Sequence, residues 1–302
     1  MVKKILITGA SGLVGNRLTE LFLQKGYQVC HLGRSKRQGA VPSFVWDVDK
    51  GIIEPETLTG VDVVIHLAGA GVADKRWTES GKSEILESRI KSSALLFETL
   101  KKEKGTVQSF VSASAIGYYG LGLSDEVFTE ESKSGSDFLA RVTKQWEEGV
   151  DKISSLGIRV VKLRIGIVLS DKGGALAEMA KPIALGFGAP LGTGNQYLTW
   201  IHLDDLCEMF IKAANDQTMN GVYNAVSPEW VTNIEMTKTI AKVLKKPLWL
   251  PPIPGFVLRI ILGEMADIVL NGSKVSSDKI QKTGIKFQYT KLENALKNLL
   301  SK

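Results

Sequence analysis

The sequence predicts an α/β fold in which a doubly wound parallel sheet carries a smaller C-terminal lobe. Short apolar runs that resemble buried strands alternate with amphipathic helical patterns through the first half of the chain. The first strand ends at a glycine-rich loop that opens directly into a helix, whereas four prolines between positions 247 and 254 interrupt the more irregular last third. We therefore expect residues 1–172 to form the sheet domain, with later segments returning to it, and residues 173–302 to form the lobe.

Composition limits the possible functions. The chain has 302 residues, and its 44% hydrophobic content is enough for a large core. Its 38 basic and 32 acidic residues are scattered along the length, so the net charge of +6 gives little support to a nucleic-acid or membrane surface. The N-terminus enters the first strand almost at once, and no apolar run is long enough to span a bilayer, so we expect neither a signal peptide nor a membrane span.

The two cysteines, Cys30 and Cys207, have no spacing typical of a metal site or a disulfide framework. We expect both to be core thiols of a protein in a reducing cytoplasm, and we expect no bound metal. The partner that the sequence favours is a small-molecule substrate, and the oligomeric state stays open.

The glycine loop lies between a strand at residues 3–8 and a helix that begins at Leu13, with glycines at positions 9, 12 and 15. Glycine lets the backbone turn sharply and approach a pyrophosphate, and the first N–H groups of the helix favour negative charge. The alternative is a tight strand-to-helix turn without a ligand. Because of the strand–loop–helix order, we predict a dinucleotide site. The residues expected to line it are Gly9, Ser11, Gly12, Leu13 and Val14.

A basic run follows the second strand, where an NAD-selective fold would carry an acidic residue for the ribose 2′-hydroxyl. Arg34, Lys36 and Arg37 occupy this run instead. Arg34 would favour a 2′-phosphate through charge-assisted contacts, so the cofactor predicted is NADP. The alternative is a solvated basic turn.

The next strands deliver further candidates to the carboxyl edge of the sheet. Asp47 ends the third strand, where it could accept a hydrogen bond from the adenine amino group or cap the turn at 49–51. His66 ends the fourth strand, at 61–67, and we expect it to be a hydrogen-bonded core residue. Small residues after it would let the backbone pass close to a ligand. The edge candidates here are Leu67, Ala68 and Gly69.

Three later segments complete the candidate set. A long helix at 80–104 places Glu84 and Arg89 on or near one face. The sixth strand continues to Ile167, whose backbone could contact the nicotinamide. A glycine-rich loop at 186–194 is expected over the pocket. We expect His202, at its exit, to be a hydrogen-bonded residue that orients this loop before the helix start at 204–205.

The segment that follows the fifth strand, Ser114 with Gly117-Tyr118-Tyr119, completes a set of motifs. Together with the glycine loop and residues 66–69, it resembles the extended short-chain dehydrogenases/reductases. More narrowly, the chain resembles their branch of NAD(P)-dependent sugar-nucleotide epimerases. Further marks of that branch are Trp77, Ser88-Arg89-Ile90, Trp146-Glu147 and the Gly192 to His202 segment. The resemblance covers nearly the whole chain and implies a Rossmann-type fold with an oxidoreductase or epimerase activity.

The resemblance also implies roles for single residues. Ser114 matches the hydroxyl that hydrogen-bonds the substrate oxygen as hydride is transferred at the neighbouring carbon, although a serine in this turn could also simply bond to local backbone. Leu67 and Ala68 match backbone positions along the cofactor, and Arg34 matches the 2′-phosphate contact. Glu84 and Arg89 match helix positions that face the cofactor.

One motif of the family is missing. Active members carry Tyr-x-x-x-Lys on the next helix, predicted here at 136–156, and that helix contains no tyrosine. Lys144 is in register if Ala140 takes the tyrosine position, whereas anchoring on Trp146-Glu147 puts Leu139 and Thr143 there. A phenol could come instead from Tyr118 or Tyr119, although aromatic residues in such a turn also pack or stack. The candidate catalytic residues are Ser114 and Tyr119.

Two functions fit these observations. The first is an NADP-dependent oxidoreductase or epimerase that acts by hydride transfer on a small polar substrate such as a nucleotide sugar. The second is a protein that binds NADP(H) as a sensor or regulator without turnover. The missing tyrosine favours the second function, whereas the retained Ser114 and the pocket loop favour the first.

Overall fold

A sheet of eight strands forms the centre of the computed structural model, which describes residues 2–103 and 105–301. The strand order is β12-β8-β6-β5-β1-β2-β3-β4, and all neighbours are parallel except β3 and β4. This is the doubly wound Rossmann-type arrangement, so the predicted fold class is confirmed. The strands are β1 (Lys4–Thr8), β2 (Gln28–Gly33), β3 (Ser43–Asp47), β4 (Ile52–Ile53), β5 (Val63–His66), β6 (Ser109–Ala115), β8 (Arg159–Ile165) and β12 (Gly221–Ala225).

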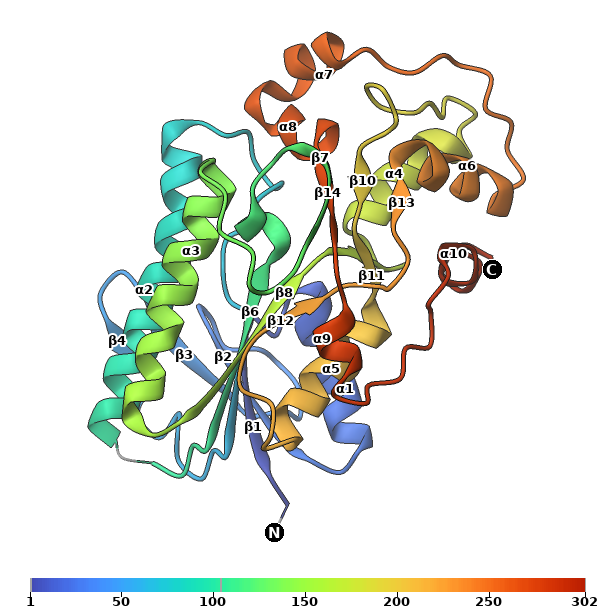
Figure 1. Ribbon diagram of the computed structural model, residues 1–302. Helices are drawn as coiled ribbons and strands as arrows, with labels where there is room; N and C mark the ends of the chain where they lie inside the picture. The colour runs from blue at the N-terminus through green and yellow to red at the C-terminus, as the bar shows by residue number, and fades with distance from the viewer. Residues whose placement is uncertain (1, 104, 302) are drawn as a thin grey trace.

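Helices cover both faces of this sheet (Figure 1). The pair α2 (Glu79–Glu103) and α3 (Phe138–Asp151) packs on one face, and the pair α1 (Leu13–Gln24) and α5 (Leu203–Asn215) packs on the other. The predicted end of the long helix, Lys104, lies outside the described residues. The carboxyl ends of the parallel strands point toward the C-terminal lobe, which places the sheet edge and the lobe opposite each other.

The lobe has a hydrophobic cluster of its own around the fully buried Trp200. Its main helices are α4 (Ala175–Ala184), α6 (Asn233–Val243) and α10 (Leu292–Leu300), and its apolar end carries α7 (Gly255–Leu262) and α8 (Ala266–Leu270). Three short two-stranded sheets lie here, of which the first two join the lobe to the main domain and the third lies within the lobe. They pair β7 (Leu123–Phe128) with β14 (Gly272–Val275), β9 (Ile167–Leu169) with β11 (Trp200–His202), and β10 (Tyr197–Leu198) with β13 (Val231–Thr232). The remaining short helices are η1 (Ile116–Tyr119), η2 (Lys152–Leu156), η3 (Gly263–Met265) and α9 (Asp278–Gln281).

The boundary between the two parts is not a single point in the sequence. Residues 203–225 return to the main domain, because the apolar side of α5 packs into the main core and β12 pairs with β8. The later α9 also contributes Ile280 to that core. The lobe is therefore assembled from segments on either side of this returning unit.

Local signals in the sequence explain how the lobe helices begin. Thr232 and Glu235 form a reciprocal capping box at α6, which satisfies backbone N–H groups that the helix leaves free. His202 is hydrogen-bonded, as expected, and it caps α5, because its Nδ1 accepts the Asp204 N–H at 3.0 Å. The loop at 186–194 has no regular structure but is held in place, since the Gly192 N–H donates to Ile253 O at 2.9 Å.

Several buried polar residues serve the core. The Nδ1 of His66 lies 2.9 Å from Thr8 Oγ1, and burial lowers the pKa of His66 to about 3, so it is the hydrogen-bonded core residue predicted. Cys30 and Cys207 are both buried free thiols. Across the described residues, no helix has the length and apolar character needed to cross a bilayer.

Candidate functional site

The glycine loop is shaped by close backbone packing at two of its three glycines. Gly9 has φ +66°, and a Cβ there would lie 2.9 Å from the backbone carbon of Leu67. A Cβ on Gly15 would lie 2.4 Å from Gly9 O, so α1 packs directly against the loop. Gly12 differs, because the nearest atom to its Cβ position is Gly9 O at 3.4 Å. Its surroundings thus leave room for a ligand to approach the backbone.

The N-terminus of α1 adds electrostatic character to this loop. Gly12 is the N-cap residue and supplies no side-chain cap, so N–H groups of the first turn are left for another acceptor. An open groove of about 230 Å³ lies here, lined by Ser11, Leu13, Asn16, Arg17, Lys172 and Gly174. Of its cations, Arg17 is paired with Asp204 at 2.7 Å, and Lys172 lies 3.6 Å from Glu20. The loop therefore has the backbone donors and the space that a dinucleotide pyrophosphate needs.

The basic run after β2 is divided between the loop and the solvent. Arg34 is exposed, and Lys36 pairs with Glu54 at 2.9 Å. Arg37 instead reaches the glycine loop, where its Nη1 donates to Ala10 O at 2.5 Å and its Nη2 to Asn16 Oδ1 at 2.8 Å. The sequence predicted the 2′-phosphate contact at Arg34. The contact of Arg37 with the glycine loop was not predicted, although Arg37 belongs to the same run. Both guanidinium groups remain candidates for a 2′-phosphate.

Asp47 caps a turn. Its Oδ1 accepts the Lys50 N–H at 3.0 Å and its Oδ2 lies 3.1 Å from Lys50 Nζ, and these contacts hold the pKa of Asp47 below its usual value. Of the two possibilities that the sequence left open, turn capping is the one that the geometry displays.

The carboxyl ends of β1 and β5 are tied together by one hydroxyl. Thr8 Oγ1 accepts the N–H groups of Leu67 at 3.1 Å and Ala68 at 3.2 Å. These two residues and Gly9 thus share one narrow stretch of backbone beside the glycine loop. The structure brings together the loop and the edge residues that the sequence assigned to the cofactor.

Arg89 lies beneath the chain that leaves β5. A Cβ on Gly69 would be 3.1 Å from Arg89 Cζ, and Arg89 Nη1 donates to Ala70 O at 3.0 Å and Ile85 O at 2.8 Å. Its guanidinium also lies 5.0 Å from the Trp146 ring centre. Burial lowers the pKa of Arg89 to about 10, so the guanidinium is still charged at neutral pH.

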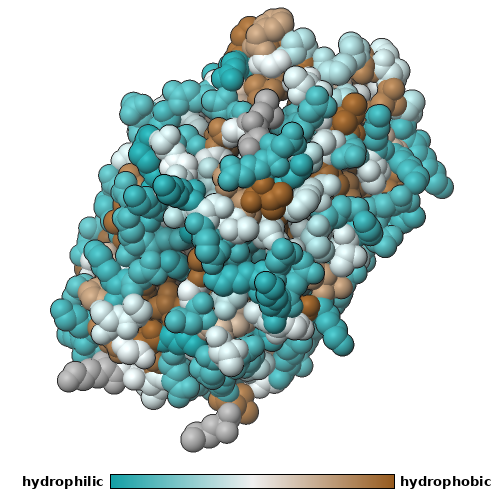
Figure 2. Space-filling model, viewed as in Figure 1, coloured by the Kyte–Doolittle hydropathy of each residue, from teal (hydrophilic) through white to brown (hydrophobic). Residues whose placement is uncertain are grey.

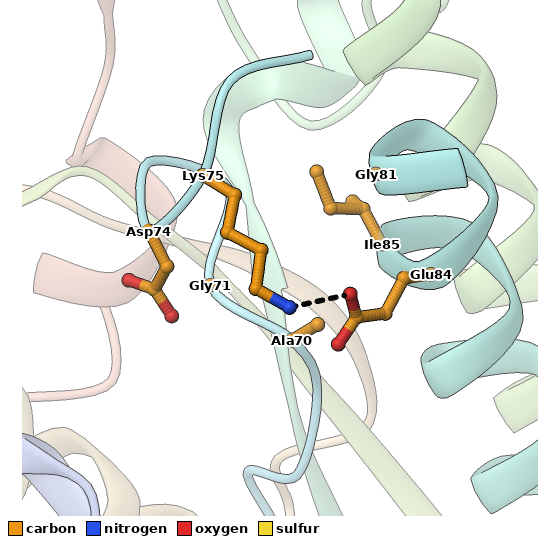
Figure 3. Close-up of a pocket in the computed structure, with 7 residues that line it drawn as sticks. All are labelled: Ala70, Gly71, Asp74, Lys75, Gly81, Glu84 and Ile85. Atoms are coloured by element: carbon orange, nitrogen blue, oxygen red, sulfur yellow. Dashed lines mark hydrogen bonds and ion pairs between the residues drawn. The ribbon is translucent and has the colours of Figure 1, made fainter. Parts of the chain in front are cut away.

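Glu84 turns away from this arrangement. Its carboxylate is exposed and pairs with Lys75 at 3.1 Å, across a small hollow of about 30 Å³ between α2 and the loop after β5 (Figure 3). Helical spacing placed Glu84 and Arg89 on or near one face, but the structure directs the carboxylate to the rim and the guanidinium inward.

Ser114 ends β6 inside a buried network of charges. Its Oγ donates to Glu147 Oε1 at 2.6 Å, and Arg164 holds the same carboxylate at both oxygens, at 2.8 and 2.9 Å. Ser114, Glu147 and Arg164 are only 3%, 5% and 2% exposed. Burial alone would raise the pKa of Glu147, but the contacts with Arg164, Ser114 and Lys162 hold it below its ordinary value. Glu147 is therefore an ionised carboxylate at neutral pH.

Tyr119 joins the same network from the other side. Its hydroxyl donates to Asn224 Oδ1 at 2.6 Å and accepts from Arg164 Nη1 at 3.1 Å. Burial raises the pKa of Tyr119 to about 12. Ser114 and Tyr119 are thus linked through Glu147 and Arg164. Tyr118 covers Arg164, with its ring centre 3.4 Å from the guanidinium carbon.

The structure favours one of the two helix registers that the sequence left open. A Cβ on Gly117 would lie 3.3 Å from Leu139 Cβ and 3.6 Å from Thr143 Oγ1, so these two residues face the turn after Ser114. Lys144 is exposed on the outside of α3. This geometry favours the register anchored on residues 146–147, in which the apolar Leu139 takes the tyrosine position.

The remaining candidates lie in the strands that join sheet and lobe. The N–H of Ile167 donates to Thr199 O at 2.8 Å, which fixes the strand end expected beside the nicotinamide. Gln196 is buried in the lobe, where its Nε2 donates to Leu191 O and Val269 O. Within the described residues, no group of three or more His, Cys, Asp or Glu could hold a metal ion.

Sequence reasoning missed the charged members of the network as site residues. Glu147 was noted only as a mark of resemblance, and Arg164 and Lys162 were not singled out. A signal was available, because β8 carries three cations, including Arg159, within a strand of otherwise apolar pattern. Cations in a central strand must be paired when buried, and that requirement points to a carboxylate on the helix above.

Comparison with known proteins agrees with this geometry. Residues 5–225 match the model of the NAD dependent epimerase/dehydratase family, and residues 253–299 match a domain of unknown function, DUF1731. The epimerase family protein YfhF of Bacillus subtilis is 35% identical over 300 residues, which cover 98% of each chain.

Two solved structures extend the similarity to three dimensions. The crystal structure of human epimerase family protein SDR39U1 (isoform 2) with NADPH has a TM-score of 0.89 and 29% identity, over 99% of both chains. The nucleoside-diphosphate sugar epimerase from Corynebacterium glutamicum has a TM-score of 0.82 and 30% identity, over 99% of this chain and 58% of that one. The motifs, the fold and these matches all agree, and the chain belongs to the NAD dependent epimerase/dehydratase family.

Proposed function

We propose that this protein is an NADP(H)-dependent oxidoreductase or epimerase whose substrate is a small polar molecule with a hydroxyl group at the reacting carbon, such as a nucleotide sugar. The glycine loop and the uncapped N-terminus of α1 support dinucleotide binding. Arg34 and Arg37 support a 2′-phosphate, and the human relative was solved with NADPH. When bound, the nicotinamide would supply the hydride chemistry.

The observation that carries the proposal is the hydrogen bond from Ser114 to Glu147. A serine hydroxyl has one proton, and Ser114 gives it to an ionised carboxylate. The lone pairs of Ser114 Oγ are then left to accept a hydrogen bond. A substrate hydroxyl can donate to them, whereas a carbonyl oxygen cannot. Glu147 Oε1 is also the nearest carboxylate oxygen to which Ser114 could pass a proton. The site in this state therefore suits a hydroxyl that is to be oxidised.

The proposal also covers the substrate lobe, the residues beside the cofactor and the cellular setting. We propose that the lobe formed largely by residues after 172 binds the substrate opposite the sheet edge, and that Ile167 and residues 67–69 border the cofactor. We also propose a reducing cytoplasmic setting, which the buried free thiols Cys30 and Cys207 support.

The central experiment is a turnover screen with a matched variant. Purified protein is given NADP⁺ with a panel of nucleotide sugars and simple alcohols, or NADPH with simple carbonyl compounds, and NADPH absorbance is followed. We expect turnover with a hydroxyl substrate, and Ser114→Ala should reduce kcat by about 10²-fold or more with NADPH affinity unchanged. Ser83→Ala, on the exposed part of α2, is the control. Turnover that Ser114→Ala leaves intact would remove the role given to Ser114.

Cofactor choice is tested separately by NADPH and NADH binding. We expect tighter binding of NADPH and a loss of that preference in Arg34→Ala, in Arg37→Ala or in both, because each removes a cation near the predicted 2′-phosphate position. Equal binding of both cofactors to the unmodified protein would contradict the assignment to NADP.

A second candidate function is NADP(H) binding without turnover. It is favoured by the engagement of Tyr119, whose hydroxyl is held by Asn224 and Arg164 with a pKa of about 12, and by the outward position of Lys144. Tyr119→Phe discriminates the two roles of this phenol. If Tyr119 is only structural, the variant should bind NADPH normally and lose about 1–3 kcal/mol of unfolding free energy. A selective loss of kcat would make Tyr119 catalytic.

A further inference from the structure

A small surface at the end of the C-terminal lobe exposes three large apolar side chains. Leu185, Phe187 and Trp249 are 65%, 63% and 65% exposed. Exposed lysines border them where α4 and α6 end. We call this surface the basic apolar tip, and its residues are Lys181, Leu185, Phe187, Lys245, Lys246 and Trp249.

The backbone beneath the tip is held in place. Trp249 Nε1 donates to Gly186 O at 3.0 Å, which ties the loop after α4 to the segment after α6. The Ile253 N–H continues this pairing by donating to Pro190 O at 2.8 Å. A Cβ on Gly188 would lie 2.6 Å from Ile183 and 2.9 Å from Leu248, so the base of the tip is closely packed. The apolar side chains therefore project from an ordered base.

The charged side chains that form the tip are all basic. The sequence contains no Asp or Glu between Glu178 and Asp204, or between Glu235 and Glu264, although the chain has 32 acidic residues. Within the part of the chain that the structure describes, Lys181, Lys245 and Lys246 form no ion pair. The even distribution of charge over the whole chain conceals this local excess of positive charge.

The exposed face of α7 lies at the same end but differs in charge. Figure 2 shows apolar residues at the top of the molecule, over α7 in Figure 1, and Phe256 and Ile260 are 66% and 74% exposed. Acidic residues accompany this helix and are paired, Asp267 with Arg259 and Glu264 with Lys82. A purely cationic border distinguishes the tip from α7.

We propose that the basic apolar tip docks on a membrane surface that contains anionic lipids. Lysines near such a surface are attracted by its negative potential. Tryptophan is favoured at the membrane–water interface, and Leu and Phe side chains gain by burial in the acyl boundary. The tip exposes three large apolar side chains and its charged residues are all lysines, and this combination fits a flat anionic surface. The proposal concerns docking of the folded protein and is independent of its reaction.

The test is co-sedimentation with vesicles. The full-length protein is mixed with vesicles of phosphatidylcholine alone or of phosphatidylcholine with phosphatidylglycerol, at low and at high salt. We expect binding to the vesicles with phosphatidylglycerol that weakens as salt rises. Lys181→Glu/Lys246→Glu should weaken the partition coefficient at least tenfold, and Phe187→Ser/Trp249→Ser should do so as well.

Two control variants match these changes elsewhere on the surface. Lys101→Glu/Lys102→Glu alters net charge equally at the far end of α2, and Leu23→Ser/Ile52→Ser removes two other exposed apolar side chains. Both should bind vesicles within about twofold of the unmodified protein.

Three outcomes would overturn the proposal. They are no binding to anionic vesicles, equal loss in the tip and control variants, or a concentration-dependent dimer in sedimentation velocity that the tip substitutions abolish. The last outcome would assign the tip to contact between two copies of the chain. Thermal melting of each variant confirms that it is folded.

Discussion

Different kinds of contact hold the two halves of the sheet's carboxyl edge together. At β1 and α1 the decisive contacts join backbone atoms, because Gly9 and Gly15 allow approaches that any side chain would block. At β6 and α3 they join buried charged groups, with Glu147 between Ser114 and Arg164. The first half keeps the pattern of dinucleotide-binding folds. The second half lacks the family's tyrosine and has a satisfied ionic network next to Ser114.

The largest effect is expected from breaking the ionic network. Glu147→Ala leaves the Arg164 guanidinium buried with only neutral partners, and an uncompensated buried charge costs about 3–5 kcal/mol. Urea unfolding should therefore show a loss of this size. Glu148→Ala, at the exposed neighbouring position, should stay within about 0.5 kcal/mol. A small effect of Glu147→Ala would mean that the network contributes little to holding the second half.

Acid should weaken both halves, but over different pH ranges. His66 has its pKa lowered from 6.5 to about 3, so the unfolded chain takes up a proton that the folded protein excludes. Its contribution is complete above pH 6.5 and is lost as pH falls toward 3, at up to about 1.4 kcal/mol per pH unit. The pKa of Glu147 is also lowered, so its contribution is present above its ordinary value of 4.5 and is lost below it.

These two ranges are measurable. In an NMR titration, the imidazole signals of His66 should keep the chemical shifts of the neutral ring down to about pH 3. The free energy of unfolding should already fall between pH 6.5 and 4.5. Glu147→Gln should reduce the pH dependence of the unfolding free energy only below pH 4.5. Titration of His66 near 6.5 would contradict the burial argument.

A smaller effect separates the glycines of the first half. Gly15→Ala forces a Cβ to within 2.4 Å of Gly9 O and should cost about 1–3 kcal/mol in unfolding free energy. In Gly12→Ala the nearest atom to the new Cβ is Gly9 O at 3.4 Å, so the loss of unfolding free energy should be smaller. This variant should still weaken NADPH binding, because its methyl group would face the pyrophosphate. Equal losses of stability in the two variants would show that Gly12 is also a packing glycine.

The difference between the halves also explains what the sequence could predict. Glycine spacing and the alternation of strands and helices are local signals, so the Rossmann-type sheet and the loop at Gly9–Gly15 were predictable. The network was predictable only in part: the cations of β8 indicate that a buried carboxylate must pair with them, but Ser114, Glu147 and Arg164 come from three separate elements and their meeting depends on strand order. Arg37 was missed for a similar reason, since two cations in one short run cannot be told apart until the loop that one of them contacts is known.

The smallest effect is expected at Lys144, and it sharpens the comparison because the family motif would make this residue important. Lys144 is exposed on α3, whereas Leu139 and Thr143 face the turn after Ser114. Lys144→Ala should therefore change unfolding free energy by less than about 0.5 kcal/mol and leave NADPH affinity unchanged. A lysine that held the cofactor ribose would instead lose charge-assisted hydrogen bonds worth about 1.5–3 kcal/mol, a loss of about tenfold or more in NADPH affinity. Fluorescence titration with NADPH distinguishes these outcomes, and a loss of that size would restore the register in which Ala140 takes the tyrosine position.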